Sequence, residues 1–323
     1  MKKIIIIDPA KGWGHFVSKI YAYRFLSKYL DSKIVFVTKK KNQIHSYLNE
    51  EKFYENTIYL DEDKNRGIKG IFYKIKNSIK VIKEIRKSNI DKCYIFHPSC
   101  RLFFLAYFAK IKNIYALGYR FQNFLVKKNN RLYNSFFSKC IPDDNEAITF
   151  VKKITKLNKI DFQPLENNSN NKNSLVGIGI AGSEEHRRWG TENLIEIIKF
   201  CIKKNHNNFL IISGKDQKNE EEYMREKLKI YNLELIFTSE KKIDDVIPYI
   251  KKCKFYVGND TGFAHLFVNY GILSNIIYGA AGAIPQFYSN QINAIDIKQN
   301  IKRSYTSIKT IKVEDVLKKI KFE

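Results

Sequence analysis

The chain has 323 residues and a formal net charge of +24 at pH 7, with 44% apolar and 28% charged residues. This composition is ordinary for a folded protein and excludes a mainly disordered, collagen-like or fibrous chain. The length exceeds the size at which one hydrophobic core usually keeps growing, so we expect two domains. The charge is uneven. Residues 1–160 carry 33 lysines and arginines against 13 acids, or +20, whereas residues 161–323 carry 24 against 20, or +4.

Membrane spans and disulfides are not expected. No run of about 18 apolar residues occurs, so no transmembrane helix is predicted. The start of the chain loosely resembles a signal peptide, but its apolar run, Ile4–Ile7, ends at Asp8 and reads better as a buried strand. The five cysteines are scattered and form no Cys-x-x-Cys motif. We therefore expect a reduced, cytoplasmic protein without a structural zinc site.

Short runs rich in Ile, Val and Phe alternate with helical patterns along the chain. The expected strands are 4–7, 34–38, 57–60, 92–96, 113–116, 175–180, 209–213, 234–237, 255–258 and 275–278. The expected helices are 15–30, 70–87, 191–204, 220–231 and 244–251. Strand–helix alternation predicts parallel sheets covered by helices. The fold class is therefore α/β, with two Rossmann-like, doubly wound domains.

The break between the two sets of elements is polar and rich in asparagine. We predict an N-terminal domain over 1–160, a linker over 161–174 that contains Pro164, and a C-terminal domain over 175–323. A helical pattern at the end of the chain, 313–322, could pack back on the N-terminal domain. Ligands of open α/β sheets bind beyond the carboxyl ends of the strands, so a cleft between the two domains is expected.

The loop after the first strand, residues 8–15 (DPAKGWGH), leads into a helix. Gly12 and Gly14 would let the backbone turn tightly and approach a ligand. A neutral imidazole at His15 could take a proton from a hydroxyl group near pH 7. The alternative is that His15 is a helix-start residue satisfied by water. Asp8 could orient His15, act as the base itself, or cap a turn.

The second half contains a weak match to a dinucleotide fingerprint. Residues 177–182 (GIGIAG) fit G-x-G-x-x-G, but the first two glycines lie inside an apolar run and no acid follows about 20 residues later. Dinucleotide binding is therefore not expected. The following residues are more informative, because Ser183 could bond a phosphate oxygen and Arg187 could stabilise a diphosphate as a bidentate donor. The alternative is a surface arginine pair, and Trp189 reads as a packing residue.

Residues 257–266 (VGNDTGFAHL) end a strand and open a helix. Backbone N–H groups at Thr261 and Gly262, together with the helix dipole, suit a diphosphate. His265 lies one turn into the helix and could reach the same anion, while Asp260 could hold the loop or accept a bond from a sugar hydroxyl. An Asp/Thr helix cap beside a buried histidine would explain Asp260 and Thr261, but not Gly262 and His265 as well.

The motif Asp-Thr-Gly-x-x-His at 260–265 resembles the nucleotide-sugar signature of bacterial glycosyltransferase family 9, the lipopolysaccharide heptosyltransferases. Residues 187–189 (RRW) resemble the basic-x-Trp element of the same family. The resemblance implies a GT-B fold and inverting, metal-independent transfer from a nucleotide sugar, typically ADP-heptose, to a lipid-anchored core sugar. No cofactor beyond the donor is implied. The matching positions assign roles as follows: phosphate binding to Ser183 and Arg187, diphosphate and sugar binding to Asp260, Thr261, Gly262 and His265, base contact to Lys241, and ribose binding to an acid among 220–222, for which we choose Glu222.

One departure from the family pattern concerns the first helix. Heptosyltransferases of this family usually have Gly-Asp there, with the aspartate as base, whereas this chain has Gly14-His15. Gly-His at this place is similar to that of other GT-B enzymes in which histidine is the base. The donor is therefore open to other nucleotide sugars, such as UDP- or GDP-sugars. A GT-B epimerase or hydrolase is a second enzyme hypothesis, and a non-catalytic nucleic-acid or membrane-binding protein is a third.

The basic half interleaves aromatic residues with cations at 69–92, 101–112 and 120–139. Such surfaces bind anionic membranes or acidic headgroups, and a phosphorylated glycolipid acceptor has the matching charge. We therefore expect association with the cytoplasmic face of the inner membrane and no nucleic-acid partner, since no nucleic-acid-binding motif occurs. We expect the basic half to face the acceptor. Neutralising three of its cations, Lys127, Lys128 and Arg131, should therefore weaken the use of the acceptor and leave donor binding unchanged.

Overall fold

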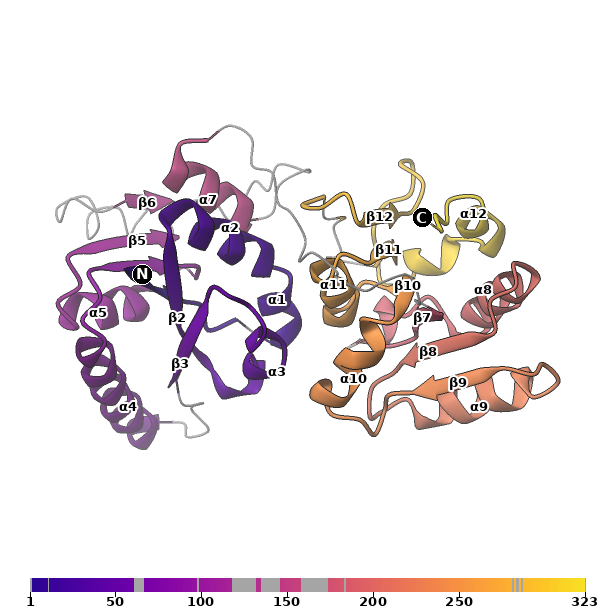
Figure 1. Cartoon of the computed structure of the whole chain (residues 1–323), viewed down its shortest axis with the longest axis horizontal. Coiled ribbons are helices and arrows are strands. Elements are labelled where there is room, and N and C mark those ends of the chain that lie inside the picture. Colours follow the sequence, from indigo (N-terminus) through magenta and orange to yellow (C-terminus); the bar gives the residue numbers. More distant parts are fainter. Residues whose placement is uncertain are drawn as a thin grey trace. The chain divides into compact units, whose positions relative to one another are not determined.

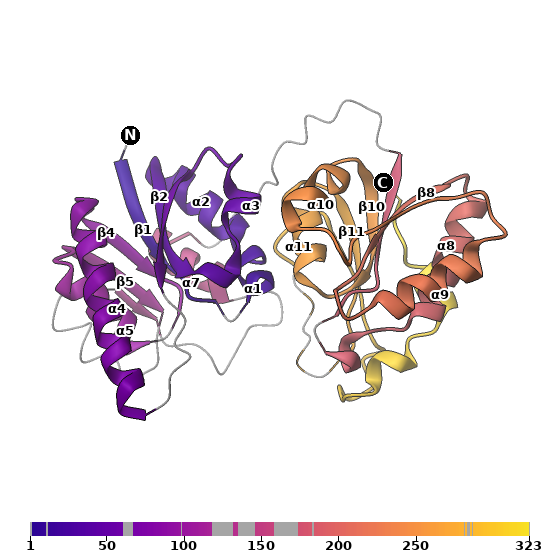
Figure 2. The same ribbon diagram turned by 90° about the horizontal axis from the view of Figure 1, so that it is seen from below.

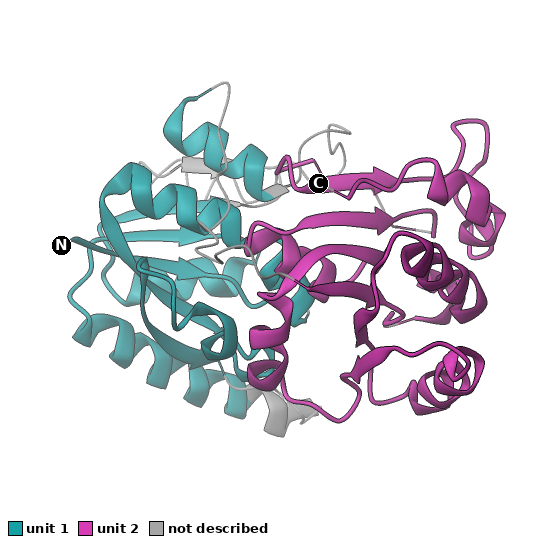
Figure 3. Cartoon of the chain, turned by 45° about the vertical axis from the view of Figure 1, so that its right-hand side comes forward, with its two compact units in different colours: residues 1–162 teal, residues 163–323 magenta. Residues whose placement is uncertain are grey.

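The computed structural model describes residues 2–10, 12–60, 67–97, 99–117, 132–134, 146–157, 174–182, 184–280, 282, 285 and 287–322. The chain divides into two compact units, residues 1–162 and 163–323 (Figure 3). The division falls inside the segment 161–174 that we predicted as a linker. Each unit is a parallel sheet with helices on both faces (Figure 1), so the predicted α/β class with two doubly wound domains is confirmed.

Unit 1 contains a parallel sheet with the described strand order β3-β2-β1-β4-β5-β6. The strands are β1 Lys2–Ile7, β2 Ser32–Lys39, β3 Tyr54–Leu60, β4 Lys92–Ile95, β5 Asn113–Leu117 and β6 Leu132–Asn134. The helices are α1 Trp13–Val17, α2 Ile20–Leu30, α3 His45–Leu48, α4 Gly67–Lys87, α5 Cys100–Phe108 and α7 Glu146–Thr155. The isoleucine run of β1 is buried because the central strand of such a sheet is covered on both faces.

The two faces of the unit 1 sheet carry different cores. Ile5 and Ile7 of β1 share a core with Val81 of α4 and Phe103 of α5, which places α4 and α5 on one face (Figure 2). The other face holds packed aromatic rings: Tyr23 of α2 lies 5.1 Å from Phe96 between ring centroids, and Phe96 lies 4.9 Å from Phe150 of α7.

Unit 2 repeats the architecture with the described strand order β12-β11-β10-β7-β8-β9. The strands are β7 Leu175–Gly179, β8 Asn208–Ile212, β9 Glu234–Phe237, β10 Cys253–Asn259, β11 Leu273–Ile277 and β12 Ile292–Ile295. The helices are α8 Thr191–Lys203, α9 Lys218–Leu228, α10 Ile243–Ile250, α11 Gly262–Asn269 and α12 Val313–Leu317. The core on one face joins residues of α8, α9 and α12 to the sheet.

Several elements differ from the prediction. The helix expected over 15–30 is two helices, because the chain turns at Ser18 and Lys19 between α1 and α2. Strands β6 and β12 were not predicted; each is a short strand at an edge of its sheet. None of the described helices is long and apolar enough to cross a bilayer.

The end of the chain packs within unit 2, not on unit 1 as we considered. Val316 and Ile320 belong to the core of unit 2. Asn275 of β11 binds the backbone of Lys321 twice, through its Nδ2 to the carbonyl and through its Oδ1 from the N–H, each at 2.9 Å. A buried asparagine on a central strand needs such partners, and the C-terminal backbone supplies them.

The glycines of 177–179 are explained by packing, not by a nucleotide. A Cβ on Gly258 of β10 would lie 2.5 Å from the Cα of Gly179 on neighbouring β7, and a Cβ on Gly179 would overlap the ring of Tyr256. Both glycines therefore allow close approach of backbone and ring inside the sheet.

Replacing Gly258 with alanine is expected to destabilise the protein by about 3 kcal/mol, because the clash is with backbone that cannot swing aside. Gly12→Ala is the matched control. Its added Cβ would meet nothing within 4 Å and its φ of −161° is ordinary extended backbone, so a change within about 0.5 kcal/mol is expected. Urea unfolding of both variants measures this, and equal stability would contradict the packing explanation.

Candidate functional site

The loops at the carboxyl edge of the unit 2 sheet are joined by one buried side chain, that of Asn259 at the end of β10. Its Nδ2 donates to the carbonyls of Ile180 and Ala181 at 3.0 and 3.1 Å, and its Oδ1 accepts from the backbone N–H of Trp189 at 2.9 Å. Asn259 is fully buried, so all three bonds are made away from water. The loop that carries the arginine pair is therefore held against the strand that leads into Asp260.

Helix α11 starts directly after this point. Thr261 is its N-cap and accepts a hydrogen bond from the Ala264 N–H at 3.4 Å. The first N–H groups of a helix have no partner inside the helix, and the dipole makes this end electropositive. His265 is 5% exposed and is held on both ring nitrogens, by Tyr288 Oη at 2.8 Å from Nδ1 and by Asp260 Oδ1 at 3.2 Å from Nε2. Asp260 therefore orients the imidazole.

The two neighbouring arginines have different environments. Arg188 Nε donates to the carbonyl of Gly182 at 2.9 Å, and its guanidinium is paired with Asp216, which lowers the pKa of that carboxyl group. Arg187 Nε lies 3.2 Å from Glu184 Oε2 but is buried without a hydrogen bond. An ion pair to a carboxylate whose side chain is 57% exposed is weak. Arg187 is thus the arginine available to a ligand, whereas Arg188 braces the loop.

Trp189 is a core residue, as we predicted when we interpreted it as a packing residue. It is 2% exposed, and its indole N–H donates to the carbonyl of Ile311 at 2.8 Å. The basic-x-Trp element therefore contains an anchor, Trp189, that fixes where Arg187 stands.

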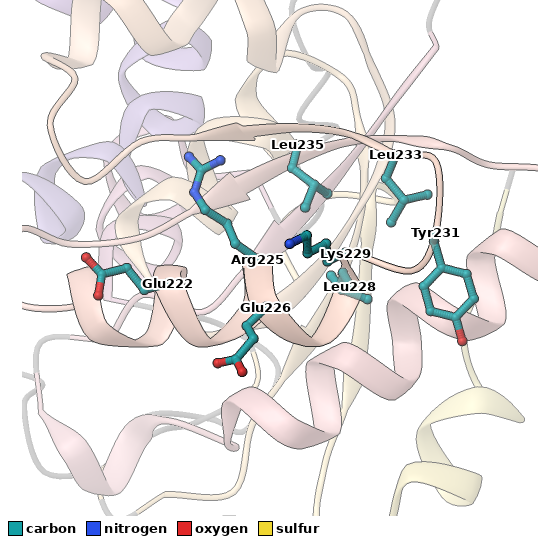
Figure 4. A pocket seen from close by; sticks show the side chains of 8 residues that line it. All are labelled: Glu222, Arg225, Glu226, Leu228, Lys229, Tyr231, Leu233 and Leu235. Atoms are coloured by element: carbon teal, nitrogen blue, oxygen red, sulfur yellow. The ribbon is translucent and has the colours of Figure 1, made fainter.

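The acid that faces the carboxyl edge is Glu221 and not Glu222. Glu221 is buried and accepts hydrogen bonds from the Ser213 hydroxyl after β8 and from the Ser239 N–H and hydroxyl after β9. Glu222 is exposed and lines an open pocket of about 620 Å³ between α9 and β9, together with Arg225 and Leu235 (Figure 4). Consecutive helical residues point about 100° apart, so one of the two must leave the edge. Of the acids that we considered for the ribose, Glu221 lies at this edge and our choice, Glu222, does not.

Two further predicted donor residues have different outcomes. Lys241 is exposed in the turn after β9, where its backbone N–H donates to the Thr238 carbonyl at 3.0 Å and its ammonium lies 5.7 Å from the Tyr249 ring centroid. Thr238 Oγ1 in turn accepts from the Ser213 N–H at 3.0 Å, so this turn adjoins the loop after β8. Ser183 lies outside the described residues.

Asp8 lies at the carboxyl end of β1 in unit 1 and is completely buried. Its Oδ2 accepts from Lys19 Nζ at 2.8 Å and from the Tyr23 hydroxyl. Burial, and then the nearby Asp8 charge, raise the pKa of Tyr23 well above its usual value, so Tyr23 stays a neutral donor. Asp8 is thus an internal anion that ties the start of α2 to the central strand.

His15 is exposed on α1, in the loop region that follows β1. The tight turn that we expected at Gly12 is absent, because its φ of −161° and ψ of 169° are extended backbone. Gly14 lies inside α1, and its carbonyl accepts from the Ser18 N–H at 3.0 Å. Lys127, Lys128 and Arg131 lie outside the described residues.

The described part of the chain contains no group of three or more His, Cys, Asp or Glu residues that could hold a metal ion. The polar residues of these sites that we did not single out are Asn259 at the end of β10, Glu221 in α9, Lys19 at the start of α2 and Tyr288 in the loop before β12. Asn259 offered a signal, since a lone asparagine closes an otherwise apolar run. The partners of the others are separated by many residues in sequence and carry no such signal.

Comparison with known proteins gives a consistent result. The model of glycosyltransferase family 9 (heptosyltransferase) matches residues 79–269, more than half of the chain. This range includes the unit 2 site but not Asp8 or His15. A curated relative, lipopolysaccharide heptosyltransferase 1 of Campylobacter coli, is 25% identical over 178 residues, which are 51% of this chain and 51% of the relative. The match thus spans about half the length of that relative.

Solved structures match over nearly the whole chain. E. coli ADP-heptose lps heptosyltransferase II has a TM-score of 0.72 at 15% identity, covering 99% of this chain and 97% of that one. E. coli heptosyltransferase WaaC with ADP has a TM-score of 0.70 at 14% identity and 98% coverage of both chains. These likenesses confirm the GT-B fold. Together with the family match, they show that the chain belongs to glycosyltransferase family 9, the heptosyltransferase family, and it is a glycosyltransferase by that membership.

Proposed function

We propose that the protein is an inverting glycosyltransferase that moves a sugar from a nucleotide donor, most simply heptose from ADP-heptose, to an anionic lipopolysaccharide or lipooligosaccharide core acceptor. The observation that carries this proposal is the held pair Asp260–His265 at the start of α11, with Arg187 on the loop bound to the same strand end. The names of the relatives support it, since the C. coli protein is a lipopolysaccharide heptosyltransferase and WaaC was solved with ADP.

In this proposal the donor diphosphate lies at the start of α11. The Thr261 and Gly262 amides and the Arg187 guanidinium face its negative charge, which grows as the sugar–phosphate bond breaks. They supply the positive charge that a metal ion supplies in other enzymes. Both ring nitrogens of His265 are bonded, to Tyr288 and to Asp260, so His265 holds the start of the helix in place and does not itself donate to the diphosphate. A preorganised donor set of this kind costs little reorganisation during the reaction.

The nucleoside lies along the neighbouring loops. Glu221 Oε2 accepts one described bond, from the Ser239 hydroxyl, and retains the capacity to accept one from a ribose hydroxyl. Lys241, in the turn after β9, is assigned to the base.

The acceptor step belongs to unit 1. His15 removes the proton of the acceptor hydroxyl, the oxygen bonds to the anomeric carbon, and the nucleoside diphosphate leaves with the electrons of the broken bond. Asp8 is assigned a supporting role, because a fully buried carboxylate that already accepts from Lys19 and Tyr23 is a poor candidate for contact with an acceptor. The membership of a transferase family favours this reaction over an epimerase, a hydrolase or a non-catalytic binding protein.

The donor assignment is tested by thermal unfolding with ADP-, UDP-, GDP- and CMP-sugars. A ligand at 100 times its Kd stabilises the folded state by about 2.7 kcal/mol, which gives a clear shift in Tm. The expected result is a shift with the ADP-sugar. A shift with a UDP- or GDP-sugar alone would replace the donor but keep the reaction class, and no shift with any of the four would overturn the proposal.

Glu221→Gln is expected to weaken ADP-sugar binding by about tenfold, since a neutral amide accepts a ribose hydroxyl bond less well than a carboxylate. Glu222→Gln, the adjacent control, should bind as the unchanged protein does, because Glu222 is exposed beside the pocket of α9 and β9. Isothermal titration of both variants measures this. If Glu222→Gln weakened ADP-sugar binding and Glu221→Gln did not, the ribose contact would be assigned to Glu222.

A further inference from the structure

The outer faces of α4 and α5 expose large apolar side chains. Among the described residues, twelve large hydrophobic side chains are exposed, and seven of them lie on these two helices. We call this surface the α4–α5 patch; its members are Phe72, Ile75, Ile79, Phe104, Tyr107 and Phe108. Contiguous apolar exposure of this kind marks an interaction surface more often than chance.

The two helices that carry the patch lie side by side (Figure 2). The Arg86 guanidinium donates to the Phe108 carbonyl at 2.7 and 3.2 Å, and Arg101 Nε donates to Ser78 Oγ at 3.3 Å. Ring centroids of Phe104 and Phe108 are 5.9 Å apart. These contacts join α5, from its N-terminal end to its last turn, to the C-terminal half of α4.

The apolar side chains of the patch are exposed although both helices are packed against the sheet. The inner faces of both helices are buried in the unit 1 core, with Val81 and Ile85 of α4 and Leu102, Leu105 and Ala106 of α5 all at most 4% exposed. Each helix therefore exposes apolar side chains on its outer side in addition to the apolar side that it buries in the core.

Positive charge flanks the patch. At 100° per residue, Ile75, Ile79 and Phe72 form one stripe of α4, and a row of exposed lysines runs beside it at positions 76, 80, 83 and 87. Between residues 72 and 87 the only acid is Glu84, and α5 contains none. An apolar strip with a cationic border matches the interface of a bilayer whose headgroups are anionic.

We propose that the α4–α5 patch docks the protein on the surface of an anionic lipid bilayer. A nucleic acid fits less well, because the aliphatic Ile75 and Ile79 offer no ring for a base to stack on. A second copy of the chain fits less well, because two identical cationic borders would face each other and repel. The proposal deepens the proposed function by naming the surface from which a lipid-anchored acceptor is reached, but its test does not require transfer.

The patch is also well placed within unit 1. Helix α4 connects the parallel strands β3 and β4, so it runs antiparallel to them and its N-terminal half lies towards the carboxyl edge of the sheet. Phe72 and Ile75 are in that half, and the loop that carries His15 leaves the same edge after β1. Lipid at the N-terminal half of α4 would therefore lie on the side of unit 1 that holds the assigned base.

The test is co-sedimentation of the full chain with vesicles of phosphatidylglycerol and phosphatidylethanolamine, compared with phosphatidylcholine vesicles. One variant removes the apolar stripe (Phe72→Gln, Ile75→Gln, Ile79→Gln), and a second removes the border (Lys76→Gln, Lys80→Gln, Lys83→Gln). The matched control is Ile230→Gln on unit 2, since Ile230 is 84% exposed and lies outside the patch. Binding of ADP to each variant is measured in parallel.

The expected result is binding to the anionic vesicles only, with a loss of about tenfold or more in each patch variant and none in Ile230→Gln. Retained ADP binding shows that the patch variants are folded, and it separates failure of this proposal from failure of the donor assignment. The proposal is overturned by absent vesicle binding, by binding that the patch variants leave unchanged, by a dimer that the variants dissociate, or by oligonucleotide binding that they abolish.

Discussion

Replacing His15 with alanine is expected to lower kcat for sugar transfer by about 10²- to 10⁴-fold, because the acceptor hydroxyl then has no general base. The imidazole is exposed on α1, in the chain segment that leaves the carboxyl end of the central strand β1. Donor affinity should stay unchanged, since the donor residues that we assign belong to unit 2. Steady-state kinetics with saturating donor, and titration of the donor alone, separate the two effects.

A second substitution sharpens this test. His15→Asp recreates the Gly-Asp pair of the family pattern described in the sequence analysis, and it should recover part of the rate that alanine removes. Asp8→Asn should instead lower the free energy of unfolding, because it leaves Lys19 beside a neutral group inside the unit. Full activity of His15→Ala would remove the histidine from the mechanism, and a rate loss in a fully stable Asp8→Asn would move the base to Asp8.

Replacing Arg187 with alanine is expected to lower kcat/KM by about 10²- to 10³-fold, the cost of removing one preorganised donor from a developing negative charge. Its only described pairing is with Glu184, an exposed acid whose attraction is weak in water. Its Nε is buried without a hydrogen bond, which is costly unless a ligand occupies it. Initial-rate kinetics over a range of donor concentrations measure the loss.

The adjacent Arg188 provides the contrast. Arg188→Ala removes the bonds to Gly182 and Asp216, so its main effect should be on the stability of the loop and on Tm. Arg187→Lys keeps the charge but not the fork of donors and should recover only a small part of the activity. If Arg188→Ala lowered kcat/KM more than Arg187→Ala at equal stability, the two roles would be reversed.

The fold was largely predictable because its signals are local. Buried parallel strands such as β1 and β8 read as short apolar runs, and amphipathic helices such as α8 show the period of 3.6 residues. The short edge strands β6 and β12 were not predicted. Each has only three or four residues and one neighbouring strand, so its sequence shows little of the apolar pattern of a buried strand. The break between α1 and α2 was not predicted, because it falls at Ser18 and Lys19 and no glycine or proline marks it.

The donor loops were predictable in outline but not in detail. The motif at 260–265 names Asp260 and His265, yet only the folded chain shows that they bond to each other and that Tyr288 holds the second ring nitrogen. The choice between Glu221 and Glu222 depends on which side of α9 faces the sheet. A shift of one residue along the helix changes which of the two acids points to the edge. Composition could not resolve it, because both are acids in one acidic turn.

By itself, the sequence determined the α/β class, the two-domain plan, the family and the charge asymmetry, because these depend on periodicity, composition and contiguous motifs. The tertiary structure decided which of two adjacent arginines is available, which acid faces the edge, and that Asp8 is an internal anion paired with Lys19. It also showed that α4 and α5, from two separate segments, lie in contact and both expose apolar residues inside the basic half. These properties depend on contacts between residues distant in the chain, and a linear pattern does not contain them.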